Sequence, residues 1–237
     1  MTELYNREVA THYRSYRPPL HQMILGRALS SGETFFDGLD VGCGTGHSAI
    51  ALAQHCLRVF GIDPSQSMLD KAMPQAKVSY LKGAGEKIPL RDRSVDVVTF
   101  AGSLFYAKSD TLMREIKRVC RHQALAIPYD FEILLNNALP QYGIGSQVPG
   151  ADYDHNVNFS DCAGFQEITV GYEQVSLEVS ATEFAHILLS NSHRYEAFAR
   201  RYEASDPFPA LRNELGATYK KHILEANIYF SKYRLDT

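Results

Sequence analysis

The fold is decided by the stretch Leu39-Asp40-Val41-Gly42-Cys43-Gly44-Thr45-Gly46. It predicts a short buried strand, a glycine turn and an amphipathic helix over about 45–54, with an apolar face of Ala49, Ile50, Leu52 and Ala53. Glycine lets the backbone turn sharply and approach a ligand closely, because a Cβ atom would block both. Free N–H groups at the start of the helix are expected to face whatever is bound there.

A second apolar run, over residues 57–62, ends in Asp63. This carboxylate follows the glycines by about twenty residues and stands at the tip of the second strand, where it can accept hydrogen bonds from both hydroxyls of a ribose. We therefore expect a nucleoside cofactor. A dinucleotide fingerprint would place its third glycine at His47, and Asp40 before the first glycine would repel a pyrophosphate but attract a cationic amino-acid end.

The first two motifs, LDVGCGTG and GIDPSQSML, resemble those of the class I S-adenosylmethionine-dependent methyltransferases. The resemblance covers roughly residues 8–130 and implies S-adenosyl-L-methionine as the cofactor. A plainer interpretation is a strand-turn-helix unit whose glycines serve only the turn. The resemblance is to small-molecule members of the methyltransferase type 11 and trans-aconitate methyltransferase kind.

The resemblance also implies which residues bind the cofactor. They are Asp40, Gly42, Cys43, Gly44, Gly46, Asp63, Pro64, Met68, Ala84, Gly85, Glu86 and Gly102. Many members of the family carry an aspartate at the position of Ala84, where it bonds the adenine amino group, so backbone groups near Ala84 and Gly85 are expected to recognise the base here. Glu86 is expected to cap or brace this loop, and Met68 can pack on the adenine or belong to the core.

The N-terminal segment Ala10–Pro18 contains the pattern A-x-x-Y-x-x-x-R-P. It is similar to the entry segment of trans-aconitate methyltransferases, which folds over the cofactor. By this resemblance, Tyr13 and Arg17 would cover the methionine end of the cofactor and shield its methyl group from water. The alternative is an N-terminal helix that lies on the sheet with a polar outer face.

No motif identifies a catalytic residue. The candidates are Tyr106, Tyr13 and His186. Relatives often have a histidine-aromatic pair where Phe105 and Tyr106 stand, so a base at that position is missing. An acceptor carboxylate or tertiary amine would need no general base, whereas a hydroxyl or a protonated amine would.

Metal binding is not expected. A cluster of Asp152, Asp154 and His155 could ligate a cation, but polar surface residues in a long loop are the favoured interpretation. The four cysteines are scattered without a C-x-x-C pair, which indicates neither a zinc site nor a disulfide framework.

The composition fits one compact protein of 237 residues, 45% of them hydrophobic, with a net charge of −3. Without a basic field, nucleic acid and anionic membranes are not expected partners. The chain has no apolar run near the roughly 20 residues of a membrane span. We expect a cytoplasmic protein that is a monomer or homodimer and binds a small-molecule acceptor.

The predicted fold is α/β, a doubly wound Rossmann-like sheet of about seven strands whose last strand is antiparallel, with a helical cap. Three parts are expected: an N-terminal helical lid segment (1–30), an S-adenosylmethionine-binding core (31–130), and a remainder of the sheet (131–237) with substrate-cap insertions at about 131–160 and 181–221. Residues 121–123 are predicted as a loop, where the family has a Pro-Gly-Gly turn, and the final strand is predicted to close the sheet beside the preceding one.

The favoured function is methyl transfer from S-adenosylmethionine to a small molecule. A non-catalytic S-adenosylmethionine-binding protein is an alternative, because the adenine aspartate and the histidine are both missing. An NAD(P)-dependent oxidoreductase shares the strand-glycine-acid layout, and His47 argues against it. An RNA methyltransferase would require strongly salt-dependent RNA binding.

Overall fold

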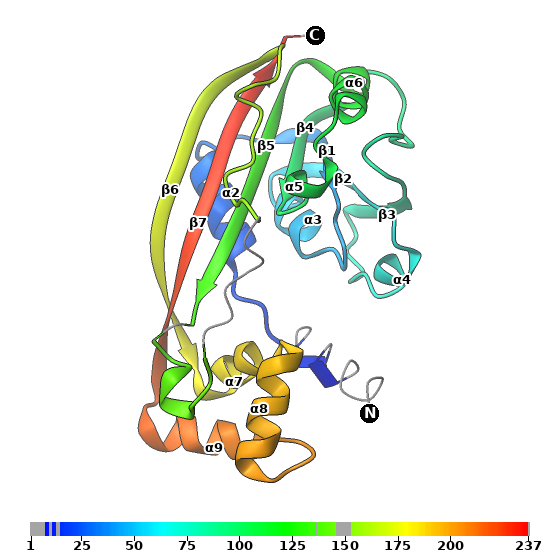
Figure 1. The fold of residues 1–237 in the computed structure, drawn as a ribbon. Helices are drawn as coiled ribbons and strands as arrows, with labels where there is room; N and C mark the ends of the chain where they lie inside the picture. Colours follow the sequence, from blue (N-terminus) through cyan, green and yellow to red (C-terminus); the bar gives the residue numbers. More distant parts are fainter. Residues whose placement is uncertain (1–7, 10, 13–14, 136, 146–152, 237) are drawn as a thin grey trace. The chain divides into compact units, whose positions relative to one another are not determined.

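A computed structural model of the chain describes residues 8–9, 11–12, 15–135, 137–145 and 153–236 (Figure 1). One seven-stranded sheet has the order β3-β2-β1-β4-β5-β7-β6. Its strands are β1 (Phe35–Val41), β2 (Cys56–Asp63), β3 (Val78–Lys82), β4 (Val95–Ala101), β5 (Cys120–Leu134), β6 (Phe165–Ser180) and β7 (Lys221–Leu235). The helices with assigned bounds are α2 (Leu20–Ala28), α3 (His47–Leu52), α4 (Gln66–Leu69), α5 (Leu104–Ala107), α6 (Asp110–Val119), α7 (Ala181–Leu189), α8 (Ser192–Tyr202) and α9 (Phe208–Thr218), with a 3-10 turn η1 (Pro140–Tyr142).

The parallel part of the sheet is built on β1, which pairs with β2 and β4. β3 and β5 extend it on either side, also in parallel. β4 is buried on both faces, which explains why its sequence is an almost continuous apolar run. Figure 1 shows β7 running opposite to β5 and β6. The predicted Rossmann-like sheet with an antiparallel last strand is therefore confirmed.

Two details of the predicted sheet are wrong. β7 lies between β5 and β6, so β6 is the edge strand and the last strand does not close the sheet. Residues 121–123 are not a loop, because β5 already begins at Cys120. They form an irregular stretch in which Val95 pairs with Cys120 while Val97 pairs with Leu125. The Arg121 guanidinium contributes to holding this stretch, since it contacts Asp96 at 2.7 Å and Asp37 at 3.0 Å.

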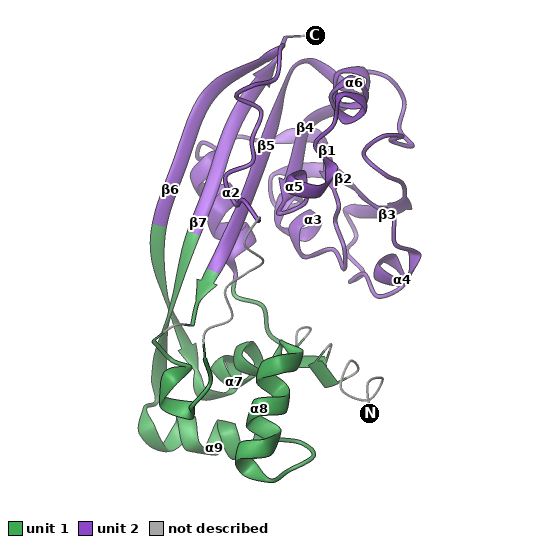
Figure 2. Cartoon of the chain, in the orientation of Figure 1, with its two compact units in different colours: residues 1–18, 133–151, 174–227 green, residues 19–132, 152–173, 228–237 purple. Residues whose placement is uncertain are grey.

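The chain divides into two compact units, coloured separately in Figure 2. Unit 2 (19–132, 152–173 and 228–237) holds the parallel strands. Its apolar core packs α6 against β1 and β4, with Leu39, Val98 and Ile116 fully buried. This unit contains every residue of the cavity described below.

Unit 1 (1–18, 133–151 and 174–227) contains α7, α8 and α9. Their apolar faces form a separate core that includes Leu188, Phe198 and Leu211. α7 begins with a capping box in which Ser180 accepts from the Glu183 N–H and the Glu183 carboxylate accepts from Ser180. The expected helical stretch after residue 180 is thus three helices, and its role as a substrate cap remains a prediction.

Candidate functional site

The glycine turn between β1 and α3 has a conformation that only glycine adopts easily. Gly42, Gly44 and Gly46 have φ angles of 75°, 53° and 92°. A Cβ on Gly42 would lie 2.5 Å from Ser103 Cβ, and one on Gly46 would collide with the Tyr80 hydroxyl. Both the left-handed backbone and the close packing therefore require glycine. The helix begins after this turn, at His47, and is shorter than predicted.

The backbone N–H groups of this turn bond within the protein. Those of Gly42 and Cys43 both donate to Ile62 O, at 2.8 and 3.0 Å. The N–H of Gly44 donates to Asp63 Oδ2 at 2.9 Å. These three bonds tie the turn to the end of β2. The expectation that N–H groups at the start of the helix face a ligand concerns the residues that follow, from His47 on, and stays a prediction.

Asp63 is held at the carboxyl end of β2 by two backbone donors. Besides the bond from Gly44, its Oδ1 accepts from the Ser65 N–H at 2.8 Å. Only 8% of the residue is exposed. Each carboxylate oxygen can accept more than one hydrogen bond, so both keep acceptor capacity for ligand hydroxyls.

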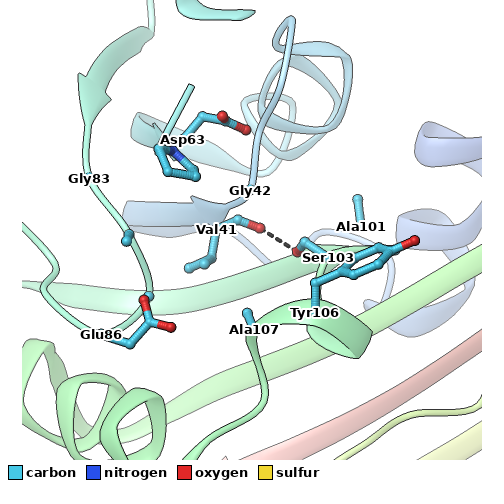
Figure 3. A pocket seen from close by; sticks show the side chains of 13 residues that line it. Val41, Gly42, Asp63, Gly83, Glu86, Ala101, Ser103, Tyr106 and Ala107 are labelled. Atoms are coloured by element: carbon cyan, nitrogen blue, oxygen red, sulfur yellow. Dashed lines mark hydrogen bonds between the residues drawn. The ribbon is translucent and has the colours of Figure 1, made fainter. Parts of the chain in front are cut away.

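A cavity of about 410 Å³ opens beside Asp63 at the carboxyl edge of the parallel strands (Figure 3). Its lining residues are Val41, Gly42, Asp63, Pro64, Gly83, Ala84, Gly85, Glu86, Ala101, Gly102, Ser103, Tyr106 and Ala107. Seven of the fourteen predicted cofactor residues thus meet around one cavity although they come from four separate segments. Parallel strands end at the same edge, which is why motifs far apart in sequence converge there.

Ser103 is a lining residue that the sequence interpretation missed. Its hydroxyl donates to the Val41 carbonyl, the bond drawn as a dashed line in Figure 3, and so joins the ends of β4 and β1. The available signal was its place directly after Gly102, at the end of a buried strand. The Tyr106 ring stands beside Ser103 and is 77% exposed, which leaves it accessible as one wall of the site.

Asp40 is placed differently from Asp63. It is fully buried, accepts from Ser48 Oγ at 2.5 Å and from Thr99 Oγ1 at 2.9 Å, and does not line the cavity. Burial raises the pKa of Asp40 to about 6, and its two hydroxyl donors oppose the shift. Asp40 thus braces β1 to α3 and β4, and a direct contact with the cofactor remains only a prediction.

The remaining predicted residues lie outside the cavity lining. Cys43 is buried, which raises the pKa of its thiol, and Met68 packs next to Gly44. Gly44 and Gly46 shape the turn. Arg17 and His186 belong to unit 1, and Tyr13 lies outside the described residues.

His186 has a histidine as its neighbour. Its Nδ1 lies 2.9 Å from His12 Nδ1, and burial lowers the pKa values of both rings, that of His12 to about 4. A neutral pair is the consequence. The roles of Arg17, Tyr13 and His186 stay predictions.

The described residues contain no metal-binding cluster and no membrane-spanning helix. In those residues no group of three or more His, Cys, Asp or Glu side chains could hold a metal ion. Of the acidic cluster, Asp154 accepts from the Asn156 N–H, His155 pairs with Asp130, and Asp152 lies outside the description. Over the same ranges, no helix combines the length and apolar character needed to cross a bilayer.

Comparison with known proteins identifies the central part of the chain. Residues 39–127 match the family described as "Methyltransferase domain". A Dictyostelium discoideum protein named as a methyltransferase is 27% identical over 127 residues, 53% of this chain and 48% of its own. An uncharacterized methyltransferase of Mycobacterium tuberculosis is 38% identical over 86 residues, 35% of each chain. This chain thus covers less than half of the length of these curated relatives.

The residues that match are a class I S-adenosylmethionine-dependent methyltransferase domain, and the predicted family, enzyme class and cofactor are confirmed at that level. The fold agrees over nearly the whole chain. A solved structure described as a type II methyltransferase from Anaeromyxobacter dehalogenans superposes with a TM-score of 0.63 at 20% identity, covering 93% of this chain and 98% of that one.

Proposed function

We propose that the whole chain is an S-adenosylmethionine-dependent methyltransferase that acts on a small-molecule acceptor. The observation that carries the proposal is Asp63, a carboxylate fixed by two backbone donors at the edge of a cavity of about 410 Å³. A cavity of this size is within the range for cofactor sites, and two close hydroxyls are the ligand groups that such a carboxylate recognises.

The lining residues fit the parts of this cofactor. Asp63 would accept hydrogen bonds from the ribose hydroxyls, and the loop through Ala84 and Gly85 would face the adenine with backbone groups. Gly42 would present its backbone to the amino-acid part at the end of β1, since it lines the cavity without a side chain. When bound, the cofactor supplies a methyl group activated by the adjacent sulfonium charge.

The protein would align the acceptor with the methyl group and exclude water from the reacting atoms. Val41, Ala101 and Ala107 give the cavity apolar walls, and the Tyr106 ring forms a face against which an acceptor can be held. Correct alignment of two reactants can lower a barrier by several kcal/mol. The proposal includes a cytoplasmic location, a monomer or homodimer, and no nucleic-acid or membrane partner, in keeping with the net charge of −3.

The test is calorimetric titration with S-adenosylmethionine and S-adenosylhomocysteine. Wild-type protein should bind both with micromolar affinity, and Asp63→Ala should not, whereas Asp110→Ala should bind as the wild type does. Asp110 is the matched control, since it is an exposed acid in the first turn of α6 and does not line the cavity. Folded wild-type protein that binds neither compound would overturn the proposal.

An assay for methylated product and a thermal-shift measurement distinguish the alternative functions. Binding of the cofactor without a methylated product across a broad acceptor panel would favour the non-catalytic cofactor-binding protein. A thermal shift with NAD or NADP, and none with S-adenosylmethionine, would favour the oxidoreductase.

A further inference from the structure

The carboxyl end of β5 carries an acid that gathers three donors. Asp130 Oδ1 accepts from the Phe131 N–H at 2.8 Å. Its Oδ2 accepts from the Tyr153 hydroxyl at 2.7 Å and from His155 Nδ1 at 2.8 Å. All four residues belong to unit 2, so their arrangement is that of one compact body. The three donors thus engage both oxygens of the Asp130 carboxyl group.

This arrangement fixes the tautomer of His155. A carboxylate only accepts hydrogen bonds, so the proton of the neutral imidazole is assigned to Nδ1 and the free electron pair to Nε2. Among the described residues no group bonds to that Nε2, and 19% of the side chain is exposed. His155 therefore offers a basic nitrogen that is oriented by an acid, which is the arrangement of a general base and its positioning partner.

Aromatic rings hold the imidazole in place. His155 stacks on Tyr229 with ring centroids 5.3 Å apart and an interplanar angle of 9°. The Tyr153 ring packs edge-on against His155 with centroids 4.8 Å apart, and it also contacts the Tyr106 ring, with centroids 5.8 Å apart. Tyr106 also lines the cofactor cavity, so successive ring contacts lead from the imidazole to a wall of that cavity.

The backbone at Gly102 gives a second connection. Gly102 lines the cofactor cavity and also a small cavity of about 10 Å³ that Asp130, Tyr153 and His155 border. That volume is enough for about one water molecule, and the otherwise largely apolar walls offer it the polar groups of Asp130, Tyr153 and His155. A Cβ on Gly102 would lie 3.0 Å from Asp130 Oδ1, so the acid lies directly behind the cavity wall.

We propose that His155 is the general base of the methyl transfer, that Asp130 is its positioning residue, and that the acceptor is a hydroxylated aromatic compound. This deepens the proposed function and rests on it. The exposed Tyr106 ring lines the cofactor cavity and is backed edge-on by Phe105, with centroids 5.1 Å apart, so it offers an aromatic face to such an acceptor.

The proton and electron balance of the step is simple. His155 Nε2 takes the hydroxyl proton, directly or through one water, and the oxygen's electron pair forms the new bond to the methyl carbon. The pair of the broken carbon–sulfur bond stays on sulfur, which neutralises the sulfonium charge. The imidazolium then returns its proton to solvent, and Asp130 stabilises it while it is charged.

The first test needs no turnover. In nitrogen-15 NMR of histidine-labelled protein, His155 should show a protonated Nδ1 and an unprotonated Nε2 near neutral pH. Asp130→Asn should remove this preference, and Asp130→Glu should restore it in part. An Nε2-protonated tautomer in the wild type would overturn the proposal.

The second test compares acceptor classes. Wild-type protein should methylate phenols, and His155→Gln should lower kcat for them by about 100-fold or more with little change in KM. Asp130→Asn should show a smaller loss that Asp130→Glu partly rescues. His193→Gln is the matched control, since it changes an exposed histidine of α8 and should have no effect.

Calorimetry and thermal unfolding of the same variants separate the explanations. If His155→Gln binds S-adenosylmethionine, unfolds like the wild type and keeps its full activity on phenols, His155 is not the base. Methylation of only carboxylates or tertiary amines would also overturn the proposal, because these acceptors carry no proton to remove. Failure of the wild type to bind the cofactor would instead overturn the proposed function.

Discussion

Two aspartates on neighbouring strands of the same sheet have opposite relations to the cavity. Asp40 in β1 is fully buried, and each of its carboxylate oxygens accepts a hydrogen bond from a hydroxyl group of the core. Asp63 in β2 is almost as buried, yet it lines the cavity, and within the described residues its hydrogen-bond donors are two backbone N–H groups. The comparison teaches that a carboxylate at the edge of a sheet becomes a ligand-binding group only when its neighbours leave acceptor capacity facing the cavity.

The largest effect is expected from Asp63→Ala, which removes the ligand-facing member of the pair. Cofactor affinity should fall by about 100-fold or more, since two charge-assisted hydrogen bonds of about 1.5 kcal/mol each are lost. Stability should fall as well, by about 1–3 kcal/mol, because the Gly44 and Ser65 N–H groups lose their acceptor. Calorimetry measures the cofactor affinity and urea unfolding the stability. A large stability loss with unchanged affinity would show that Asp63 supports the fold and does not bind the cofactor.

Asp40→Asn should change the pH dependence of folding. Burial places the pKa of Asp40 at about 6 against an ordinary 3.8, so protonation favours the folded state. The stabilisation is fully present below about pH 4 and is lost as the pH rises through about 6, by about 3 kcal/mol. Urea unfolding from pH 4 to 7 should show this decline in the wild type and a flatter profile in Asp40→Asn.

The cofactor affinity of Asp40→Asn should remain close to that of the wild type, because Asp40 does not line the cavity. Ser48 and Thr99 can turn their hydroxyls to suit an amide. An equally steep pH profile in this variant would show that another group titrates instead.

A smaller effect is expected from removing single hydroxyls around the two acids. Ser48→Ala takes one donor from buried Asp40 and should cost about 1–2 kcal/mol of stability at neutral pH. Ser65→Ala is the matched control, because the Ser65 hydroxyl contacts only Ser67 on the surface while its backbone N–H still bonds Asp63. Equal losses in the two variants, measured by urea unfolding, would contradict the different roles of the acids.

The smallest effect is expected from Ser103→Ala. It removes the bond to the Val41 carbonyl at the cavity wall and should lower stability by about 1 kcal/mol. Cofactor affinity should change by less than in Asp63→Ala, since the hydroxyl is engaged within the protein. Thermal unfolding and calorimetry of the same sample provide the measurement, and an affinity loss as large as that of Asp63→Ala would make Ser103 a direct ligand contact.

The sequence predicted the features that local chemistry determines. Alternate glycines after an apolar run require a left-handed turn, and strand β2 ends at Asp63 as its apolar run predicts. The resemblance to the methyltransferase motifs implied that Pro64, Gly85 and Gly102 belong to one site, and parallel strands that share one carboxyl edge bring them together.

Tertiary structure decided which polar side chains bond within the protein and which can still bind a ligand. Asp40 meets Thr99 because β1 and β4 are neighbours, and Arg121, in the irregular start of β5, reaches Asp37 and Asp96. No hydrophobic periodicity and no sequence motif predicts either contact.

The same holds for the acid-histidine pair proposed as base and positioning residue. Asp130 ends a strand and His155 follows a long connection, so no spacing rule predicts that they meet at 2.8 Å. Sequence fixes what each segment prefers locally, whereas hydrogen-bond partners across the fold depend on packing that the whole chain determines together.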